Sequence, residues 1–267
     1  TLGVGGCAAP IVPALHAELG RYKDKKGFDT SLAPRVAAAI AADAGNKDAL
    51  LSWAVPAFVR SQRDESLSSN IHFDFLELFS GASAPLTSAV LGRGLSAGPA
   101  LDVARHAFYD LTDARVLDWV VSLVLSGRVK VVHMGPPCTT FSVARKPSLR
   151  SSSLPWGFRP RESQTALGNA TMRAALVVFD ACIRAGAAAS FEQPASALSW
   201  AIPRVRSWVN KKTVEVLTFD MCAYGTEYKK PTKLMYVNWP ELSSLNRRCQ
   251  HVSHKVVLQG SATTKAA

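Results

Sequence analysis

The sequence lacks the features that mark disulfide-stapled and membrane-spanning proteins. Its five cysteines, at positions 7, 138, 182, 222 and 249, are odd in number and include no Cys-x-x-Cys pair. This pattern favours a reducing, intracellular compartment, the nucleus in a eukaryote, over a disulfide framework. No apolar run reaches the ~20 residues that a bilayer-spanning helix needs, since Asp180 and Arg184 interrupt the longest one. A basic segment followed by an apolar core is also missing after Thr1, so we expect neither a signal peptide nor a membrane partner.

Acidic residues are in a minority. Asp and Glu total 20 against 31 Lys and Arg, which gives a formal net charge of +11. A balance this basic favours a polyanionic partner, nucleic acid first, although it also serves solubility alone. With 267 residues, of which 48% are hydrophobic, the chain can bury one sizeable α/β core plus an extension, but not two full domains.

The pattern of residues divides the chain into three parts. Residues 1–70 are rich in helix-forming segments and end in a polar stretch, 61–70, that indicates a linker. We therefore expect a helical N-terminal extension over 1–70, a main domain over 71–240 and a short C-terminal tail over 241–267.

Strands and helices alternate in the main domain, which predicts an α/β fold with a mostly parallel sheet. The hairpin-like spacing of the last two strands favours an antiparallel pair there. We expect strands over 73–79, 129–134, 188–192, 214–219 and 233–237, a strand end at 101–103, and helices over 85–91, 114–126 and 170–185.

A glycine follows the first strand directly, in the segment Phe75–Gly81. Backbone amides at such a turn suit a carboxylate or phosphate, and an acid at the end of the next strand, here Asp102, can bond ribose hydroxyls. Asp110 and Leu111, expected after a third strand, are candidates for an adenine edge. An ordinary turn between strand and helix explains the same glycine.

The segment Gly135–Cys138, Gly-Pro-Pro-Cys, closes the strand 129–134. The two prolines fix φ and make a stiff exit from the strand. Cys138 therefore lies at the carboxyl end of a sheet strand, where α/β enzymes keep their sites, and a thiolate there can add to an electron-poor ring. The alternative is a buried structural cysteine, which the polar flank Thr139, Thr140 and Ser142 disfavours.

These segments come in the order of the motifs of the cytosine-C5 methyltransferase family, which residues 73–238 resemble. The resemblance rests on Phe75–Gly81, Gly135–Cys138 with Phe141-Ser142, Phe191–Pro194 and Ala223–Gly225 followed by the strand from Leu234 to Val237. It implies a Rossmann-like, S-adenosylmethionine-dependent methyltransferase sheet with helices on both faces, and makes 71–240 the catalytic domain.

By this resemblance, Cys138 attacks C6 of a cytosine while Glu192 holds or protonates N3, and C5 then takes the methyl group. A cytosine within duplex DNA has to leave the base stack first. The resemblance assigns S-adenosylmethionine to a further set of residues. Phe79, Ser80 and Gly81 are expected at its methionine part, Asp102 at the ribose, Val103, Asp110 and Leu111 at the adenine, and Pro136 near the donor methyl.

The loop after Cys138 is long and basic. Its cations can bind phosphates, although a mobile solvated loop explains them equally. The candidates for nucleic-acid contact are Arg145, Lys146, Arg150, Arg159 and Arg161, together with Lys230 or Lys233, which can replace a family arginine near the cytosine O2.

Several features depart from the family. Small residues, 82–84, replace further turn glycines, Gln193-Pro194 follows Glu192, and Gly168–Ala170 matches a late motif in letters but is expected to be a helix start. No room remains for a separate target-recognition domain, so a partner chain or a longer polyprotein is expected to supply it. By this resemblance we expect DNA as the substrate. A tRNA-like RNA, or a non-catalytic nucleic-acid-binding module, are the alternatives.

Cysteine and histidine cluster near the end of the chain, at Cys249, His251 and His254, with Cys222 as a distant fourth. These are zinc ligand types, but the spacing is irregular and a surface cluster accounts for them as well. The sequence therefore assigns no metal to the candidate site.

Overall fold

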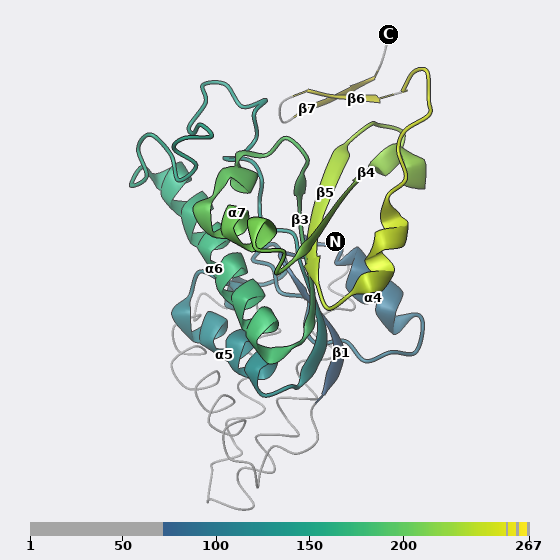
Figure 1. Cartoon of the computed structure of the whole chain (residues 1–267). Helices are drawn as coiled ribbons and strands as arrows, with labels where there is room; N and C mark the ends of the chain where they lie inside the picture. The colour runs from purple at the N-terminus through teal and green to yellow at the C-terminus, as the bar shows by residue number, and fades with distance from the viewer. Residues whose placement is uncertain (1–71, 255, 260–261, 266–267) are drawn as a thin grey trace, which may run out of the picture. The chain divides into compact units, whose positions relative to one another are not determined.

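The computed structural model describes residues 72–254, 256–259 and 262–265. The helical extension predicted over 1–70 lies outside the described residues. The described chain forms two compact units, one with residues 72–134 and 176–187 and one with 135–175 and 188 onwards. Figure 1 shows both, with labels on most of their helices and strands.

Five strands form a mixed sheet in the order β1-β2-β3-β5-β4, so the predicted α/β class is confirmed. The strands are β1 Phe73–Leu78, β2 Val129–Met134, β3 Ala188–Pro194, β4 Glu215–Asp220 and β5 Pro231–Val237. β1 pairs with β2 in parallel, whereas β5 is antiparallel to both β3 and β4. The antiparallel final pair is thus confirmed, and β5, which runs against both of its neighbours, makes the sheet mixed. The short link 221–230 explains this, because a parallel pair needs a crossover of about a dozen residues or more.

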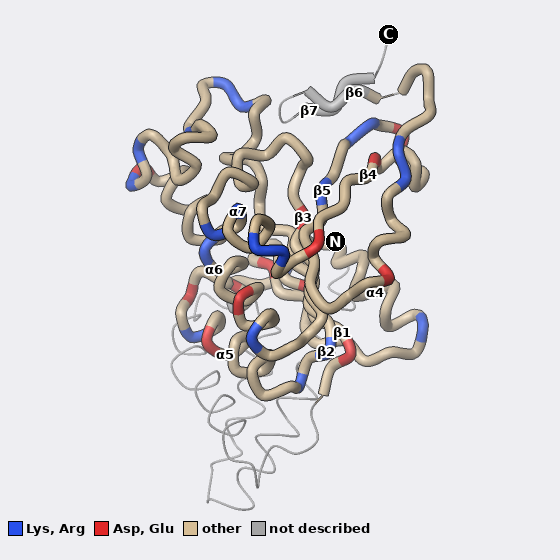
Figure 2. Tube along the Cα trace, viewed as in Figure 1, with Lys and Arg blue, Asp and Glu red and all other residues tan. Residues whose placement is uncertain are grey.

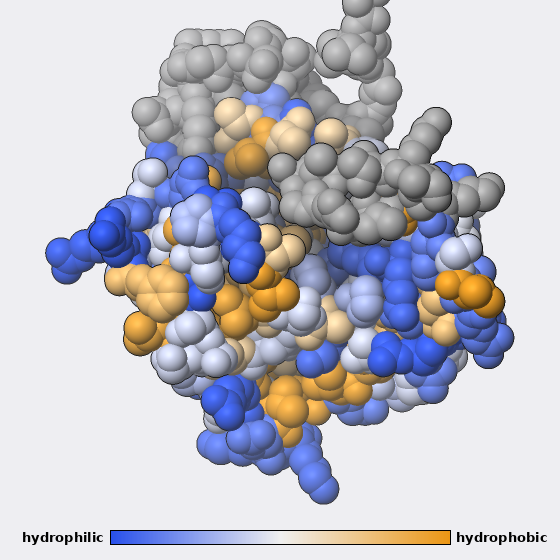
Figure 3. Space-filling view, turned by 90° about the horizontal axis from the view of Figure 1, so that it is seen from above, coloured by the Kyte–Doolittle hydropathy of each residue, from blue (hydrophilic) through white to orange (hydrophobic). Residues whose placement is uncertain are grey.

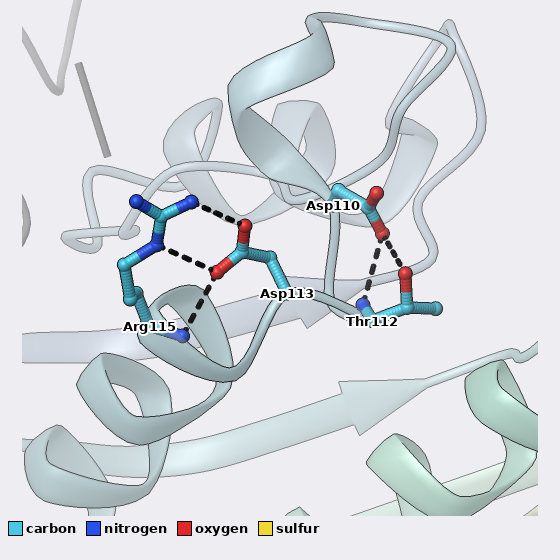
Figure 4. Close-up of polar contacts among 4 residues, drawn as sticks. All are labelled: Asp110, Thr112, Asp113 and Arg115. Carbon is cyan, nitrogen blue, oxygen red and sulfur yellow. Dashed lines mark hydrogen bonds and ion pairs between the residues drawn. The ribbon is translucent and has the colours of Figure 1, made fainter. Parts of the chain in front are cut away.

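The first unit is built on β1 and β2, with α4 Pro85–Leu91, η1 Ala107–Tyr109 and α5 Ala114–Leu125. The two helices match their predicted ranges to within one residue. α5 is amphipathic, and its buried residues follow the spacing of one helix face: Val116, Trp119, Val120, Leu123 and Val124. Its N-cap is Asp113, whose carboxylate accepts from the Arg115 amide at 2.9 Å (Figure 4). The strand end predicted at 101–103 is reduced to a single parallel bridge between Leu101 and Leu78.

Glu77 in β1 fixes where α4 begins. It is 3% exposed, and its Oε2 accepts from the Thr87 amide at 2.7 Å and from Thr87 Oγ1 at 2.6 Å. The N-cap residue of α4 is Ala84, which has no side chain to cap with. The strand carboxylate therefore takes over the capping role and places the turn 79–84 between β1 and α4.

The second unit holds β3, β5 and β4, with η2 Leu198–Ala201, α7 Pro203–Asn210, η3 Met221–Tyr224 and η4 Pro240–Leu245. Leu217, Leu234 and Tyr236 form a buried cluster, against which Leu242 and Leu245 of η4 pack. Two further strands, β6 Val256–Gln259 and β7 Ala262–Lys265, make an antiparallel hairpin. The predicted tail thus carries secondary structure of its own.

α6 spans Ser163–Ala185 and begins earlier than the predicted residue 170. Gly168 and Asn169 therefore lie inside the helix, not at its start. A Cβ at Gly168 would meet Thr140 Oγ1 and Arg150 Nη2, which explains a glycine within a helix, where it costs about 1 kcal/mol relative to alanine. Among the described residues α6 alone is long and apolar enough to cross a membrane, but core helices pass the same test, and 56% of its apolar window is buried.

Candidate active site

Cys138 lies two residues beyond a buried proline, Pro136, and directly after an exposed one, Pro137; its own side chain is half-buried. The side chain of Gln193, 1% exposed, holds this segment against the end of β3. Its Nε2 donates to the Pro136 carbonyl at 2.5 Å, and its Oε1 accepts from Ser199 Oγ at 3.2 Å. Since the prolines also fix φ, the backbone that presents Cys138 is constrained from both directions.

Glu192 and Lys230 lie beside each other, with Lys230 Nζ 3.5 Å from Glu192 Oε1. Glu192 belongs to β3, and Lys230 comes directly before β5, its antiparallel neighbour. Both side chains are partly exposed, at 25% and 32%. Such a pair contributes little to stability, and partial exposure leaves both groups open to a ligand.

The charges of both groups act on the Cys138 thiol. Burial raises the pKa of this thiol above its usual value, the Lys230 ammonium opposes the rise, and the Glu192 carboxylate adds to it. A raised pKa keeps the thiol mostly protonated at neutral pH. The structure thus brings together a thiol, a carboxylate and an ammonium group, of which the lysine is the one that favours the thiolate.

Arg150 does not lie on the surface of the loop after Cys138. It is 2% exposed, and its guanidinium makes five hydrogen bonds. Nε donates to the Thr140 carbonyl at 3.0 Å and Nη2 to Thr140 Oγ1 at 3.0 Å and the Thr165 carbonyl at 3.3 Å. Nη1 donates to the Pro155 carbonyl at 2.9 Å and to Asn169 Oδ1 at 2.6 Å. A guanidinium has five N–H donors, so every one of them is used.

The prediction that Arg150 contacts nucleic acid is therefore wrong, because no donor is left for a phosphate. The guanidinium also lies over the Phe141 ring, 3.8 Å from its centroid. The Phe141 amide donates to the Cys138 carbonyl at 2.8 Å. Arg150 is thus a positioning residue for the loop that begins at Cys138.

Replacing Arg150 by methionine should lower the free energy of unfolding by about 3 kcal/mol or more, since several buried acceptors lose a charged donor. Urea denaturation would measure this loss. Arg159→Met is the matched control, because Arg159 is exposed and pairs with Glu162 on the surface. A variant that keeps its stability and loses affinity for nucleic acid would restore the phosphate-binding assignment.

The other predicted cations are more accessible. Figure 2 marks several Lys and Arg residues on the loop that leads into α6. Lys146, Arg159 and Arg161 are exposed, whereas Arg145 is half-buried and donates to Gln164 Oε1 at 2.6 Å. Lys233 Nζ lies 5.0 Å from the centroid of the Trp200 ring. Hydrophilic residues cover much of the described part of the face in Figure 3, which suits a polar ligand.

The predicted cofactor turn has unusual backbone geometry. Phe79, Gly81 and Ala84 all have positive φ, at 57°, 64° and 42°, a conformation that is strained for the two non-glycine residues and is typical of ligand sites. Asp102 Oδ2 accepts from the Gly81 amide at 2.9 Å, and Oδ1 accepts from the Ala104 amide at 2.7 Å. The sequence expected Gly81 and Asp102 to share a ligand, and the structure places them in direct contact.

Space remains over this turn. A Cβ at Gly81 would meet no atom within 4 Å, and Val103 is 61% exposed. Ser80 is buried, with its Oγ donating to the Gly81 carbonyl at 3.1 Å. An open backbone turn, a half-buried carboxylate and an exposed apolar side chain fit the methionine part, the ribose and the adenine of S-adenosylmethionine respectively.

Asp110 follows η1, not a strand as predicted. Its Oδ1 accepts from the Thr112 amide at 2.9 Å and from Thr112 Oγ1 at 2.6 Å (Figure 4). Leu111 is 3% exposed. The aspartate thus holds a local turn, and the Leu111 side chain belongs to the core.

A pocket of about 600 Å³ opens beside η2 in the second unit. The sequence did not predict it. Its lining consists of Ser152, Ser153, Ala197, Leu198, Trp200, Ala201 and Arg206. The Leu198 amide donates to the Phe141 carbonyl at 2.8 Å, so the pocket wall is bonded to the loop after Cys138. A wall with an indole ring and a guanidinium suits a base and a phosphate.

Other functional residues that sequence reasoning missed are buried amides. Gln193 supports the proline segment, and Asn169 joins the loop to α6 by accepting from Arg150 and donating to the Trp156 carbonyl at 2.9 Å. Their one sequence signal is a polar residue at a position that the periodicity assigns to the core.

No family model matches the chain, and a search of curated proteins found no match.

Proposed function

We propose that this protein transfers a methyl group from S-adenosylmethionine to C5 of cytosine in a nucleic acid, DNA by preference. The observation that carries the proposal is the meeting of Cys138, Glu192 and Lys230 at the strand ends, with the thiol presented by two fixed prolines. The resemblance of residues 73–238 to cytosine-C5 methyltransferases supports the same assignment.

The residues of the second unit perform the steps at the base. Water takes the proton of Cys138, and the thiolate forms a bond to C6. The displaced ring electrons move toward C5 and N3, and Glu192, which takes up a proton from water, gives it to N3. Lys230 stabilises the thiolate before attack and is placed to balance negative charge on the ring. C5 then takes the methyl group, the one chemical contribution of the donor. Water then takes the C5 proton, the thiolate leaves C6 and Glu192 takes back the N3 proton, which restores the neutral aromatic ring.

The residues of the first unit are proposed to bind the donor. Gly81 offers a turn with open space above it, Asp102 a carboxylate for ribose hydroxyls, and Val103 an exposed surface for the adenine ring. Asp102 also accepts from the Gly81 amide, so the same carboxylate would hold the turn in place and bind the ribose of the donor.

Covalent trapping tests the proposal. The full chain is incubated with S-adenosylmethionine and an oligonucleotide that carries 5-fluorocytosine, because fluorine at C5 cannot leave as the proton does and the adduct persists. We expect a complex that survives denaturation, depends on the methyl donor and forms more readily with DNA than with tRNA. A stronger reaction with tRNA would reassign the substrate. No adduct with either nucleic acid, alongside reversible binding, would support the non-catalytic binding module.

The pocket beside η2 is proposed to hold nucleotides next to the target base. Arg206→Ala should weaken binding to an oligonucleotide about fivefold at low salt, which corresponds to roughly 1 kcal/mol for one lost phosphate contact. Fluorescence anisotropy at several salt concentrations would measure this change together with the smaller salt dependence expected. Arg184→Ala is the matched control, since this exposed arginine pairs with Asp180 and does not line the pocket. Equal affinities for the two variants would remove the pocket from the binding surface.

A further inference from the structure

Four metal-ligand side chains meet where β4 ends. Cys222 lies in η3, and Cys249, His251 and His254 follow η4 in the sequence. Their sulfur and nitrogen ligand atoms all lie within 4.8 Å of one another. Cys249 Sγ is 3.5 Å from His251 Nδ1 and 3.3 Å from His254 Nε2. Residues separated by the whole of β5 and η4 thus converge on one small volume.

The distances fit a tetrahedral metal site. With Zn–S bonds of about 2.3 Å and Zn–N bonds of about 2.0–2.1 Å, a sulfur and a nitrogen at two corners of a tetrahedron lie about 3.5 Å apart. The two sulfur–nitrogen distances to Cys249 are close to this value. Two thiolates and two neutral imidazoles also balance the charge of Zn²⁺, and the thiols release two protons when the ion binds.

The backbone around the cluster is held in a way that supports the ligands. Asp220 is 4% exposed; its amide donates to the Arg247 carbonyl at 3.0 Å, and its Oδ2 accepts from the Cys249 amide at 2.8 Å. The carboxylate therefore brings Cys249 to the end of the strand that leads to Cys222. Beyond this anchor, residues 246–254 form no helix or strand. Ordering an irregular segment costs conformational entropy that no regular backbone hydrogen bonds offset. A metal cross-link there therefore adds to the stability of the folded state.

We propose that Cys222, Cys249, His251 and His254 bind one zinc ion as a structural site. The ion fastens the segment 246–254 to the turn after β4. The same turn is bonded to the catalytic region, because the Met221 amide donates to the Lys230 carbonyl at 3.2 Å. The zinc site therefore also stabilises the backbone that carries Lys230. The site itself does not depend on the proposed methyl transfer.

The metal content of the purified full-length chain tests the proposal. Inductively coupled plasma mass spectrometry is expected to find about one zinc per chain, and Cys249→Ser and His254→Ala are expected to lose most of it. Cys138→Ser and His72→Ala are matched controls that remove the same ligand types outside the cluster and should keep the zinc. A protein without zinc, or with zinc that the two cluster variants retain, would overturn the assignment.

A second measurement covers variants that fail to fold. A chelator added to the unmodified protein should lower its thermal unfolding temperature, and added zinc should restore it. Mass spectrometry without reductant distinguishes the competing arrangement, a disulfide between Cys222 and Cys249. A mass lower by two hydrogen atoms with no bound metal would replace the zinc site by that disulfide.

Discussion

Replacing Cys138 by alanine is expected to lower the rate of methyl transfer by on the order of 10⁴-fold or more, because the variant has no group that can add to C6. The covalent complex with 5-fluorocytosine should also disappear. Affinity for the oligonucleotide should change little, since the side chain is small and half-buried. Transfer of a labelled methyl group and covalent trapping would measure the two losses separately.

Cys182→Ala is the matched control for this loss. Cys182 is buried, and burial raises the pKa of its thiol to about 12, so its thiolate is essentially absent at neutral pH. We expect this variant to retain trapping and methyl transfer. If both cysteine variants form the adduct equally well, Cys138 is not the nucleophile.

The pH dependence gives an independent check on the same thiol. Because burial raises the pKa of Cys138, the thiolate fraction increases with pH beyond the usual cysteine value of about 8.5, and trapping should accelerate over that range. Lys230→Gln removes the charge that lowers this pKa, so the rising limb should move to higher pH. A pH-independent trapping rate would indicate that deprotonation of Cys138 does not limit attack.

Local patterns were enough to predict most elements of the described fold. The sequence predicts α4 and α5 to within a residue, and the apolar residues that run up to Gly135 predict β2. The direction of β5 depends on the short link before it, which the sequence also contains. The predicted start of α6 is wrong because Gly168 suggests a helix boundary. The close approach of Thr140 and Arg150 accounts for that glycine instead.

The sequence predicts some residues of the candidate site and leaves others undetermined. Cys138 and Glu192 carry motif signals, and the order of the segments was sufficient to expect them near each other. The sequence leaves Lys230 and Lys233 as alternatives for the family arginine near the cytosine O2, because strand register depends on pairing between distant segments. The register places Lys233 opposite Gln193, and Lys230 pairs with Glu192. The sequence groups Arg150 with the other cations of its loop, because its five acceptors come from four separate positions along 140–169.

Replacing Glu192 by glutamine is expected to lower kcat by about 10²- to 10⁴-fold, the usual contribution of one general acid. An amide keeps the size of the side chain and can donate a hydrogen bond to N3, but it cannot transfer a proton there. Attack by Cys138 then leaves negative charge on the ring without neutralisation. Single-turnover methyl transfer would measure the rate, and anisotropy would show whether oligonucleotide affinity is retained.

The same substitution separates two roles for the carboxylate. In the resting protein Glu192 pairs with Lys230 and raises the pKa of Cys138, so removing its charge makes the thiolate easier to form. If the carboxylate acted only through the thiol, Glu192→Gln would speed trapping at neutral pH. If Glu192 acts as a general acid, we expect the opposite result. Glu192→Gln would then slow trapping, although its Cys138 thiol is more acidic. Glu215→Gln is the matched control, because this exposed glutamate of β4 accepts from the Tyr236 hydroxyl at 3.0 Å, as a glutamine can. Its rates should match those of the unmodified chain.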